Sequence, residues 1–227
     1  MKVNRLSRRD FLKTSGIILG SAVLIGSGLT VVETNQTTSP LPEFQFGENS
    51  MEKRILVTYA SQAGFTAGVA EAIGRSLSEG GAQVDVLPMQ NVKDLSAYQA
   101  VVAGSAIHGQ KWLPEAMRFL RDHQSELSRI PFASFMVCIT LSMANSGQYR
   151  EGLKSWMSPV RDLVRPVSEG YFAGGLDFSK LPFSFNVLAM GLVVLSGMWK
   201  EGDHRDWNAI RAWAEQLQPL LAQRAAR

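Results

Sequence analysis

The sequence predicts an α/β fold, a doubly wound sheet of five parallel strands with helices on both faces. From Lys53 onward, short apolar runs alternate with segments of helical periodicity, which is typical of parallel strands connected by helices. Several of these runs are apolar at consecutive positions, as expected for strands that are covered on both faces. The chain has 227 residues, 45% of them apolar, which is enough for one sizeable core.

The five expected strands are the apolar runs at residues 55–59, 83–87, 100–104, 132–140 and 167–173. The second run alternates apolar and polar residues, which favours a more exposed position near an edge of the sheet. The fourth run is the longest and contains the single cysteine, Cys138, which we expect to be a core residue rather than a redox thiol. A lone cysteine also excludes a disulfide within the chain.

Four segments have the periodicity of helices: Thr66–Glu79, Pro114 to about Leu127, Tyr149–Val160, and the residues that follow Asp206. In the first segment, Val69, Ile73 and Leu77 fall on one face, and two glycines end the pattern. A proline suits the first turn of the second helix, whereas Pro159 must end or kink the third. Asp206 has the side chain of a helix N-cap.

An apolar insertion, at about residues 176–204, separates the fifth strand from the last helix. Its centre, residues 183–199, is apolar on nearly every face of a helix, so this helix would be buried in protein or would meet lipid. This segment has only 17 residues and includes Asn186 and two glycines, so it is unsuited to span a membrane completely. Two interpretations stay open: the helix packs on the domain or on a partner, or it dips into the membrane surface.

Residues 1–32 are typical of an export signal. Residues 7–13 read Ser-Arg-Arg-Asp-Phe-Leu-Lys and resemble the twin-arginine translocation signal. The apolar run at residues 16–32 has 17 residues, which is at the short limit for spanning a bilayer, and no good cleavage site follows it. We therefore expect a protein exported by the twin-arginine route to the periplasm or another extracytoplasmic space. Whether the leader is cleaved or kept as a membrane anchor stays open.

Residues 33–52 have no periodicity and are expected to form a flexible linker, so the folded domain is expected over residues 53–222. Residues 1–32 hold five basic residues and one acidic residue, a local net charge of +4. The remaining chain holds 18 basic (23 − 5) and 19 acidic (20 − 1) residues, a net charge of −1. Because the basic charge belongs to the leader, we expect no nucleic-acid partner. No His, Cys, Asp and Glu cluster has the spacing of metal ligands, so no metal is expected.

The loop after the first strand, residues 61–66, has the character of an anion site; we call it the phosphate loop. It reads Ser-Gln-Ala-Gly-Phe-Thr and lies between a buried strand and a helix N-terminus, where unpaired backbone N–H groups and the helix dipole favour a phosphate. Ser61 and Thr66 add hydroxyl groups, and Gly64 lets an anion approach the backbone. The loop contains no Lys or Arg, and it matches neither the P-loop nor the dinucleotide-binding fingerprint.

This loop resembles the phosphate loop of flavodoxins, whose usual form is S/T-x-T-G-x-T. Ser61, Gly64 and Thr66 match the pattern, whereas Ala63 replaces a residue that carries a hydroxyl. The resemblance implies the flavodoxin strand order 2-1-3-4-5 and FMN as the cofactor. It implies that six residues hold the phosphate: Ser61, Gln62, Ala63, Gly64, Phe65 and Thr66.

Two further loops are expected to flank the flavin ring. In the flavodoxin order, the exits of the first and third strands face each other where the strand order reverses. The Gly-rich exit of the third strand supplies Ser105, Ala106, Ile107, His108 and Gly109. The loop after the fourth strand supplies Leu141, Ser142 and Met143. Trp112 either covers the ring or packs at the start of a helix.

The domain as a whole is similar to one branch of the flavodoxin-like superfamily, the menaquinone-dependent protoporphyrinogen IX dehydrogenases and their relatives. The similar stretches are residues 58–66, 101–109, the apolar insertion and residues 201–207. The resemblance implies an FMN-dependent oxidoreductase with a quinone or another lipophilic redox partner at the membrane, and its catalytic residues stay unassigned. Two alternatives remain: a non-enzymatic flavodoxin-type electron carrier, and a flavin-free interaction module tethered to the membrane.

Overall fold

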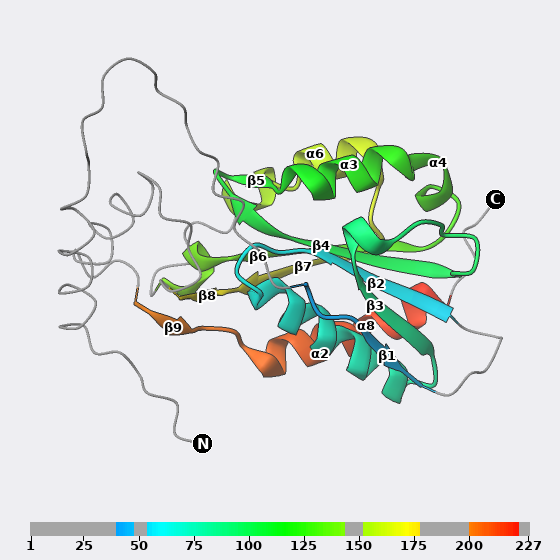
Figure 1. The fold of residues 1–227 in the computed structure, drawn as a ribbon, viewed down its shortest axis with the longest axis horizontal. Helices are drawn as coiled ribbons and strands as arrows, with labels where there is room; N and C mark the ends of the chain where they lie inside the picture. The colour runs from blue at the N-terminus through cyan, green and yellow to red at the C-terminus, as the bar shows by residue number, and fades with distance from the viewer. Residues whose placement is uncertain (1–39, 48–53, 144–151, 178–199, 223–227) are drawn as a thin grey trace, which may run out of the picture. The chain divides into compact units, whose positions relative to one another are not determined.

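Five parallel strands form the centre of the main sheet (Figure 1). They are β2 (Arg54–Ala60), β3 (Gln83–Pro88), β4 (Ala100–His108), β6 (Phe132–Cys138) and β7 (Glu169–Ala173). Their order across the sheet is β3-β2-β4-β6-β7, which confirms the predicted order 2-1-3-4-5. The computed structural model describes residues 40–47, 54–143, 152–177 and 200–222. The expected helix at residues 183–199 therefore lies outside the described residues.

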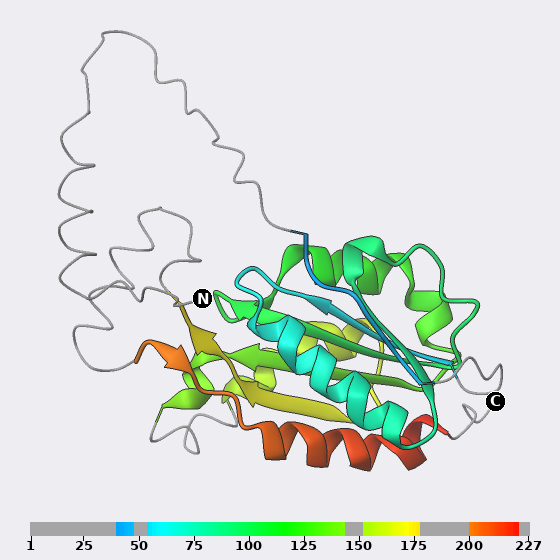
Figure 2. The same ribbon diagram turned by 60° about the horizontal axis from the view of Figure 1, so that its bottom comes forward.

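Helices cover both faces of the sheet (Figure 1). One face carries α2 (Phe65–Glu79) and α8 (Trp207–Leu221), which pack against each other side by side (Figure 2). The other face carries α3 (Pro114–Asp122), α4 (Gln124–Leu127) and α6 (Ser158–Leu163). This double cover explains why the strands are apolar at consecutive positions.

The helix cap and the proline break that the sequence predicts are both present in the structure. The carboxylate of Asp206 accepts hydrogen bonds from the backbone N–H groups of Asn208 and Ala209, both at 3.0 Å, and so caps α8. Residues 152–155 are helical, a turn follows, and Pro159 lies in the first turn of α6, so the third expected helix is broken as Pro159 required. The second expected helix is also broken, at His123, between α3 and α4.

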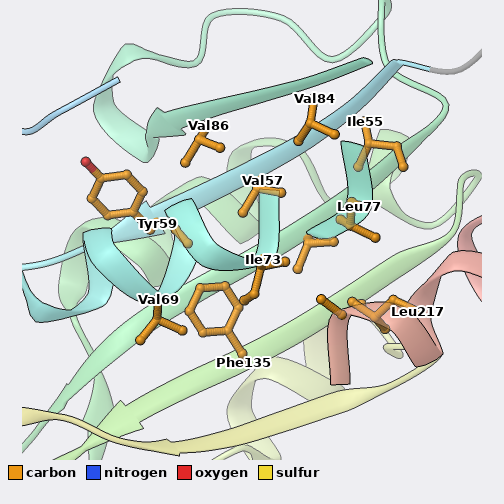
Figure 3. Packing of buried hydrophobic residues seen from close by; sticks show 14 of the residues in the cluster. Ile55, Val57, Tyr59, Val69, Ile73, Leu77, Val84, Val86, Phe135 and Leu217 are labelled. Atoms are coloured by element: carbon orange, nitrogen blue, oxygen red, sulfur yellow. The ribbon is translucent and has the colours of Figure 1, made fainter. Parts of the chain in front are cut away.

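The core between α2 and the sheet is shown in Figure 3. Val69, Ile73 and Leu77 of α2 are almost fully buried, which confirms the apolar face predicted from their spacing. They pack over the residues of β2 and β3 that point to this face, which are Ile55, Val57, Tyr59, Val84 and Val86. The packing fixes the direction of α2, and with it the position of the phosphate loop at the start of that helix.

The segment expected to be a linker contributes a strand to the sheet. β1 (Phe44–Phe46) pairs antiparallel with β3 and takes the edge of the sheet, so β3 lies next to the edge as expected. The expectation that β3 is more exposed was wrong, because nearly all of its residues are buried. Phe44 and Phe46 pack on the core beside α2. The buried carboxylate of Asp85 on β3 accepts hydrogen bonds from Gln45 at 3.0 Å and from the Nε–H of Arg54 at 2.9 Å. The polar residue in β3 therefore marks a buried polar contact with β1 rather than exposure to solvent.

Gly104 lies inside β4, not in a turn. A Cβ atom built on it would stand 2.0 Å from Cζ of Phe135, so the aromatic ring occupies the space that a side chain would need. The Phe135 ring in turn contacts Phe172 and Trp213, with ring centroids 6.2 Å away in each case. The lack of a side chain at residue 104 thus lets an aromatic cluster pack across the strands next to the site.

We predict that Gly104→Ala destabilises the protein by about 1–3 kcal/mol, because the added methyl group overpacks the core against Phe135. Urea unfolding followed by circular dichroism measures this change. Gly152→Ala is the matched control, because a Cβ at this helical position meets none of the described residues within 4 Å. The control should be neutral or stabilising by up to about 1 kcal/mol, since alanine favours a helix. Equal stability of wild type and Gly104→Ala would contradict this account.

Candidate flavin site

The exits of three adjacent strands lie together at the carboxyl edge of the sheet (Figure 2). Ala60 at the end of β2 pairs with Ser105 of β4, and Ala106 of β4 pairs with Val137 near the end of β6. The chain crosses from β2 to β3 on one side and continues from β4 to β6 and β7 on the other. The strand order therefore reverses between β2 and β4, where ligands bind in open α/β sheets.

The phosphate loop is closed by its own serine. The Oγ atom of Ser61 accepts a hydrogen bond from the backbone N–H of Gly64 at 3.0 Å. Gly64 has a φ of 82°, a left-handed conformation that glycine adopts without strain, and it precedes the first residue of α2. A Cβ at Gly64 would meet nothing within 4 Å among the described residues, so the backbone at this point is open to a ligand.

The loop presents the donors that a phosphate needs. α2 begins at Phe65, and the helix itself supplies no acceptor for the N–H groups of its first turn. Ser61 and Thr66 are buried, with 8% and 1% of their surfaces exposed, whereas Gln62 is exposed and Ala63 is half-buried. Backbone N–H groups, the Ser61 hydroxyl and the positive end of the helix dipole thus lie in one short loop at the start of α2, and these groups fit an FMN phosphate.

The second flank of the site differs from the expected glycine-rich loop. β4 continues to His108, the chain turns at Gly109 and Gln110, and β5 (Lys111–Trp112) returns antiparallel beside it. Both turn residues have positive φ, 57° and 65°, as the tightest hairpin turns require. β4 extends three residues beyond its last pairing with β2, which is about 10 Å. The flank is therefore a projecting hairpin, because the return strand supplies hydrogen-bond partners for residues 107 and 108.

Some side chains of this hairpin pack in the core, and others are exposed to solvent. The Ser105 hydroxyl donates to the carbonyl of Ala106 at 2.8 Å and accepts from the N–H of Leu113 at 3.0 Å, so it joins β4 to the start of α3. Trp112 is 4% exposed and donates to the sulfur of Met157 at 3.2 Å, so it packs in the core and does not cover a flavin ring. Ala106 and Ile107 are half-buried, and His108 is exposed.

The third strand exit is a tight turn rather than a continuation of β6. The expected strand ends at Cys138, and η2 (Ile139–Ser142) follows it. The Ser142 hydroxyl donates to the carbonyl of Ile139 at 2.7 Å. Leu141, Ser142 and Met143 are all half-buried, and η2 lies beside β7. Cys138 is buried, and burial raises the pKa of its thiol, which confirms a core residue rather than a redox thiol.

Sequence reasoning missed a cation beside the phosphate loop. The Nη1 group of Arg205 donates to the carbonyl of Phe65 at 3.1 Å, although the two residues are 140 positions apart in the chain. The Phe65 ring lies against Gly175, where a Cβ atom would stand 2.1 Å from Cε1 of the ring. The Phe65 side chain is therefore packed beneath distant parts of the chain. Its neighbours were not recognisable from local sequence.

A family model described as "Flavodoxin domain" matches residues 56–202. The protoporphyrinogen IX dehydrogenase [quinone] of Leishmania major is 25% identical over 178 residues, which cover 75% of this chain and 77% of that protein. A Streptococcus pneumoniae flavodoxin is 16% identical with a TM-score of 0.47, over 74% of this chain and 97% of that one. An archaeal flavodoxin is 15% identical with a TM-score of 0.45, and the match covers 75% of this chain and 99% of that one.

The family model covers well over half of the chain, including β2, the phosphate loop, the hairpin and the strand exits of the candidate site. Flavodoxin domains bind FMN, which confirms the cofactor that the loop pattern predicted. The structure adds that the donors at the start of α2 fit the phosphate of this cofactor. This chain belongs to the flavodoxin-domain family.

Proposed function

We propose that this protein is an FMN-dependent oxidoreductase that passes electrons to a quinone at a membrane. The observation that carries the proposal is the phosphate loop between β2 and α2, placed where the strand order reverses. When bound, FMN supplies reversible electron and hydride transfer at its ring. The protein's own residues bind the cofactor, orient it and control what reaches it.

Each of the three strand exits has a role in this proposal. The backbone N–H groups of the phosphate loop and the hydroxyls of Ser61 and Thr66 hold the phosphate. The projecting hairpin, through residues 106–109, flanks one side of the ring with backbone groups, and the buried Ser105 supports it from within the sheet. The turn at residues 141–143 flanks the other side with apolar and hydroxyl groups. Leu141 and Met143 would limit the access of water to the ring without contributing a charge.

The quinone partner is supported by the Leishmania major relative, whose name includes that acceptor, and by where apolar segments join the domain. The Tyr59 hydroxyl donates to the carbonyl of Pro42 at 2.5 Å, and Asn91 donates to Glu43 at 2.6 Å, so the chain enters at the carboxyl edge of the sheet. Two short paired strands, residues 175–176 and 202–203, follow β7 and lie on either side of the insertion's centre. The described residues that enter the domain at residue 40 and those on either side of the insertion's centre therefore lie at the edge that carries the candidate site.

Membrane association and export rest on the sequence of residues 1–32. Of the helices that the structure describes, none is both long enough and apolar enough to cross a bilayer. The apolar runs at residues 16–32 and 183–199 lie outside the described residues. We propose that the twin-arginine leader carries the protein out of the cytoplasm and that the leader or the insertion keeps the carboxyl edge near lipid. Protoporphyrinogen, the substrate class of the relative, is the first electron donor to test.

The proposal predicts that the purified full-length protein binds one FMN per chain and shows the visible absorption band of oxidised flavin. After anaerobic reduction, a water-soluble menaquinone analogue should reoxidise the flavin. Continuous anaerobic turnover with protoporphyrinogen and the quinone, compared with a flavin-free control, tests for an enzyme. Flavin oxidation without turnover by any donor would indicate an electron carrier. A protein that binds no FMN would refute the proposal and would leave the tethered interaction module.

The proposal also predicts that Ala63→Thr tightens FMN binding by about fivefold, because it restores the hydroxyl of the flavodoxin pattern at about 1 kcal/mol per added hydrogen bond. Quenching of flavin fluorescence measures the affinity. Ala63→Val is the matched control, because it adds the same branched shape without a donor and should not tighten binding. Riboflavin, which lacks the phosphate, should bind the wild type and the Ala63→Thr variant equally. Equal FMN affinity of the Thr and Val variants would contradict the assigned phosphate position.

A further inference from the structure

We propose that Arg205 is a positioning residue for the FMN phosphate, acting through the carbonyl of Phe65; this inference rests on the proposed FMN function. The phosphate loop itself contains no Lys or Arg. The structure brings Arg205 to it from the segment between β9 (Gly202–Asp203) and α8. The role we assign is to fix the direction of one peptide group at the start of α2.

Arg205 is held in place on every side. Its guanidinium carbon lies 4.3 Å from the centroid of the Trp207 ring and 5.3 Å from that of the Phe65 ring. Two of its nitrogens, Nε and Nη2, donate to the carboxylate of Asp203 at 2.8 Å and 2.7 Å, a forked pairing. Only 15% of the Arg205 side chain is exposed. The remaining nitrogen, Nη1, is therefore directed at the Phe65 carbonyl with little freedom to move.

Two glycines make room for this arrangement. A Cβ atom on Gly68 of α2 would stand 2.2 Å from Nη1 of Arg205. A Cβ on Gly175, which pairs with Asp203 across the short β8 (Gly175–Leu176) and β9 ladder, would stand 2.1 Å from the Phe65 ring. Arg205 and Phe65 thus lie directly against backbone that carries no side chain. The close fit at both positions shows that the first turn of α2 and the base of the apolar insertion interlock.

The link to the phosphate follows from the geometry of the peptide bond. The carbonyl of Phe65 and the N–H of Thr66 belong to one planar peptide group, in which a trans bond points them in opposite directions. A hydrogen bond that fixes the Phe65 carbonyl therefore also aims the Thr66 N–H back toward the phosphate loop. That N–H is one of the donors at the helix start for which the helix has no acceptor. Arg205 thus pre-orients a phosphate donor without touching the phosphate.

Asp203 makes it possible to distinguish orientation of the Phe65 peptide group from direct attraction of the phosphate by the Arg205 charge. Its carboxylate is hydrogen-bonded by Arg205, which lowers the pKa of Asp203, so the pair is a neutral unit at physiological pH. If Arg205 acted as a free cation on the phosphate, removal of the Asp203 charge would strengthen FMN binding. If it acts by orientation, loss of the fork loosens Arg205, and Asp203→Asn weakens FMN binding.

The test compares FMN and riboflavin binding by the full-length wild type and its variants, using flavin fluorescence. Arg205→Gln should weaken FMN binding by about tenfold and change riboflavin binding by less than about twofold, because only FMN carries the phosphate. Arg205→Lys can still reach the Phe65 carbonyl but cannot form the fork, so its FMN affinity should be intermediate. Arg211→Gln is the matched control: Arg211 is exposed on α8, bonds only Asn208 among the described residues, and loses the same charge.

Gly68→Ala provides a second variant, since it displaces Nη1 while Arg205 and the net charge stay unchanged. It should reproduce the FMN-specific loss, and a change of less than about twofold in riboflavin binding would show that the rest of the flavin site is intact. Unchanged FMN affinity in Arg205→Gln, equal losses of FMN and riboflavin affinity, or tighter FMN binding by Asp203→Asn would each overturn the inference. A wild type that binds neither flavin would refute the proposed function itself, and this inference with it.

Discussion

The backbone N–H groups that α2 presents in its first turn are the constraint on which the rest of the site depends. α2 begins at a strand exit and has a left-handed glycine in place of a side-chain cap, so the helix itself supplies no acceptor for the N–H groups of its first turn. The Ser61–Gly64 hydrogen bond shapes the loop, and Arg205 fixes the next peptide group from outside. The loop needs no charge of its own, because aligned donors and the helix dipole attract a phosphate.

The packing around the sheet serves this constraint by holding three strand ends in register. α2 is anchored by its buried face over β2 and β3, and β4 and β6 are joined by the Phe135 cluster packed against Gly104. The hairpin then extends beyond the sheet from a rigid base, since Ser105 and Trp112 are both engaged in the core. Precise placement of a flavin ring requires such support from residues that never touch it.

The sequence was sufficient for features that depend on local patterns. Three such features were predicted: the apolar spacing of Val69, Ile73 and Leu77, the helix cap at Asp206, and the loop at residues 61–66. Each lies within a short stretch of sequence, so periodicity and residue chemistry are enough to recognise it. β1 was missed because three residues are too short for a periodic signal and its pairing depends on the free edge of β3. The length of β4 depends on a return strand and on the Phe135 ring, so its glycines resembled a loop. Arg205 reaches Phe65 only through tertiary contacts, and no local pattern contains that information.

The central claim is that the start of α2 binds the phosphate of FMN, and backbone amide NMR tests it most directly. Addition of FMN to the isotopically labelled full-length protein should shift the amide signals of Gly64, Phe65 and Thr66 strongly, with Thr66 among the largest changes. Riboflavin should leave these three signals nearly unchanged while it shifts those of the hairpin at residues 106–109. The same response of residues 64–66 to both flavins, or FMN-induced shifts confined to other parts of the domain, would contradict the account.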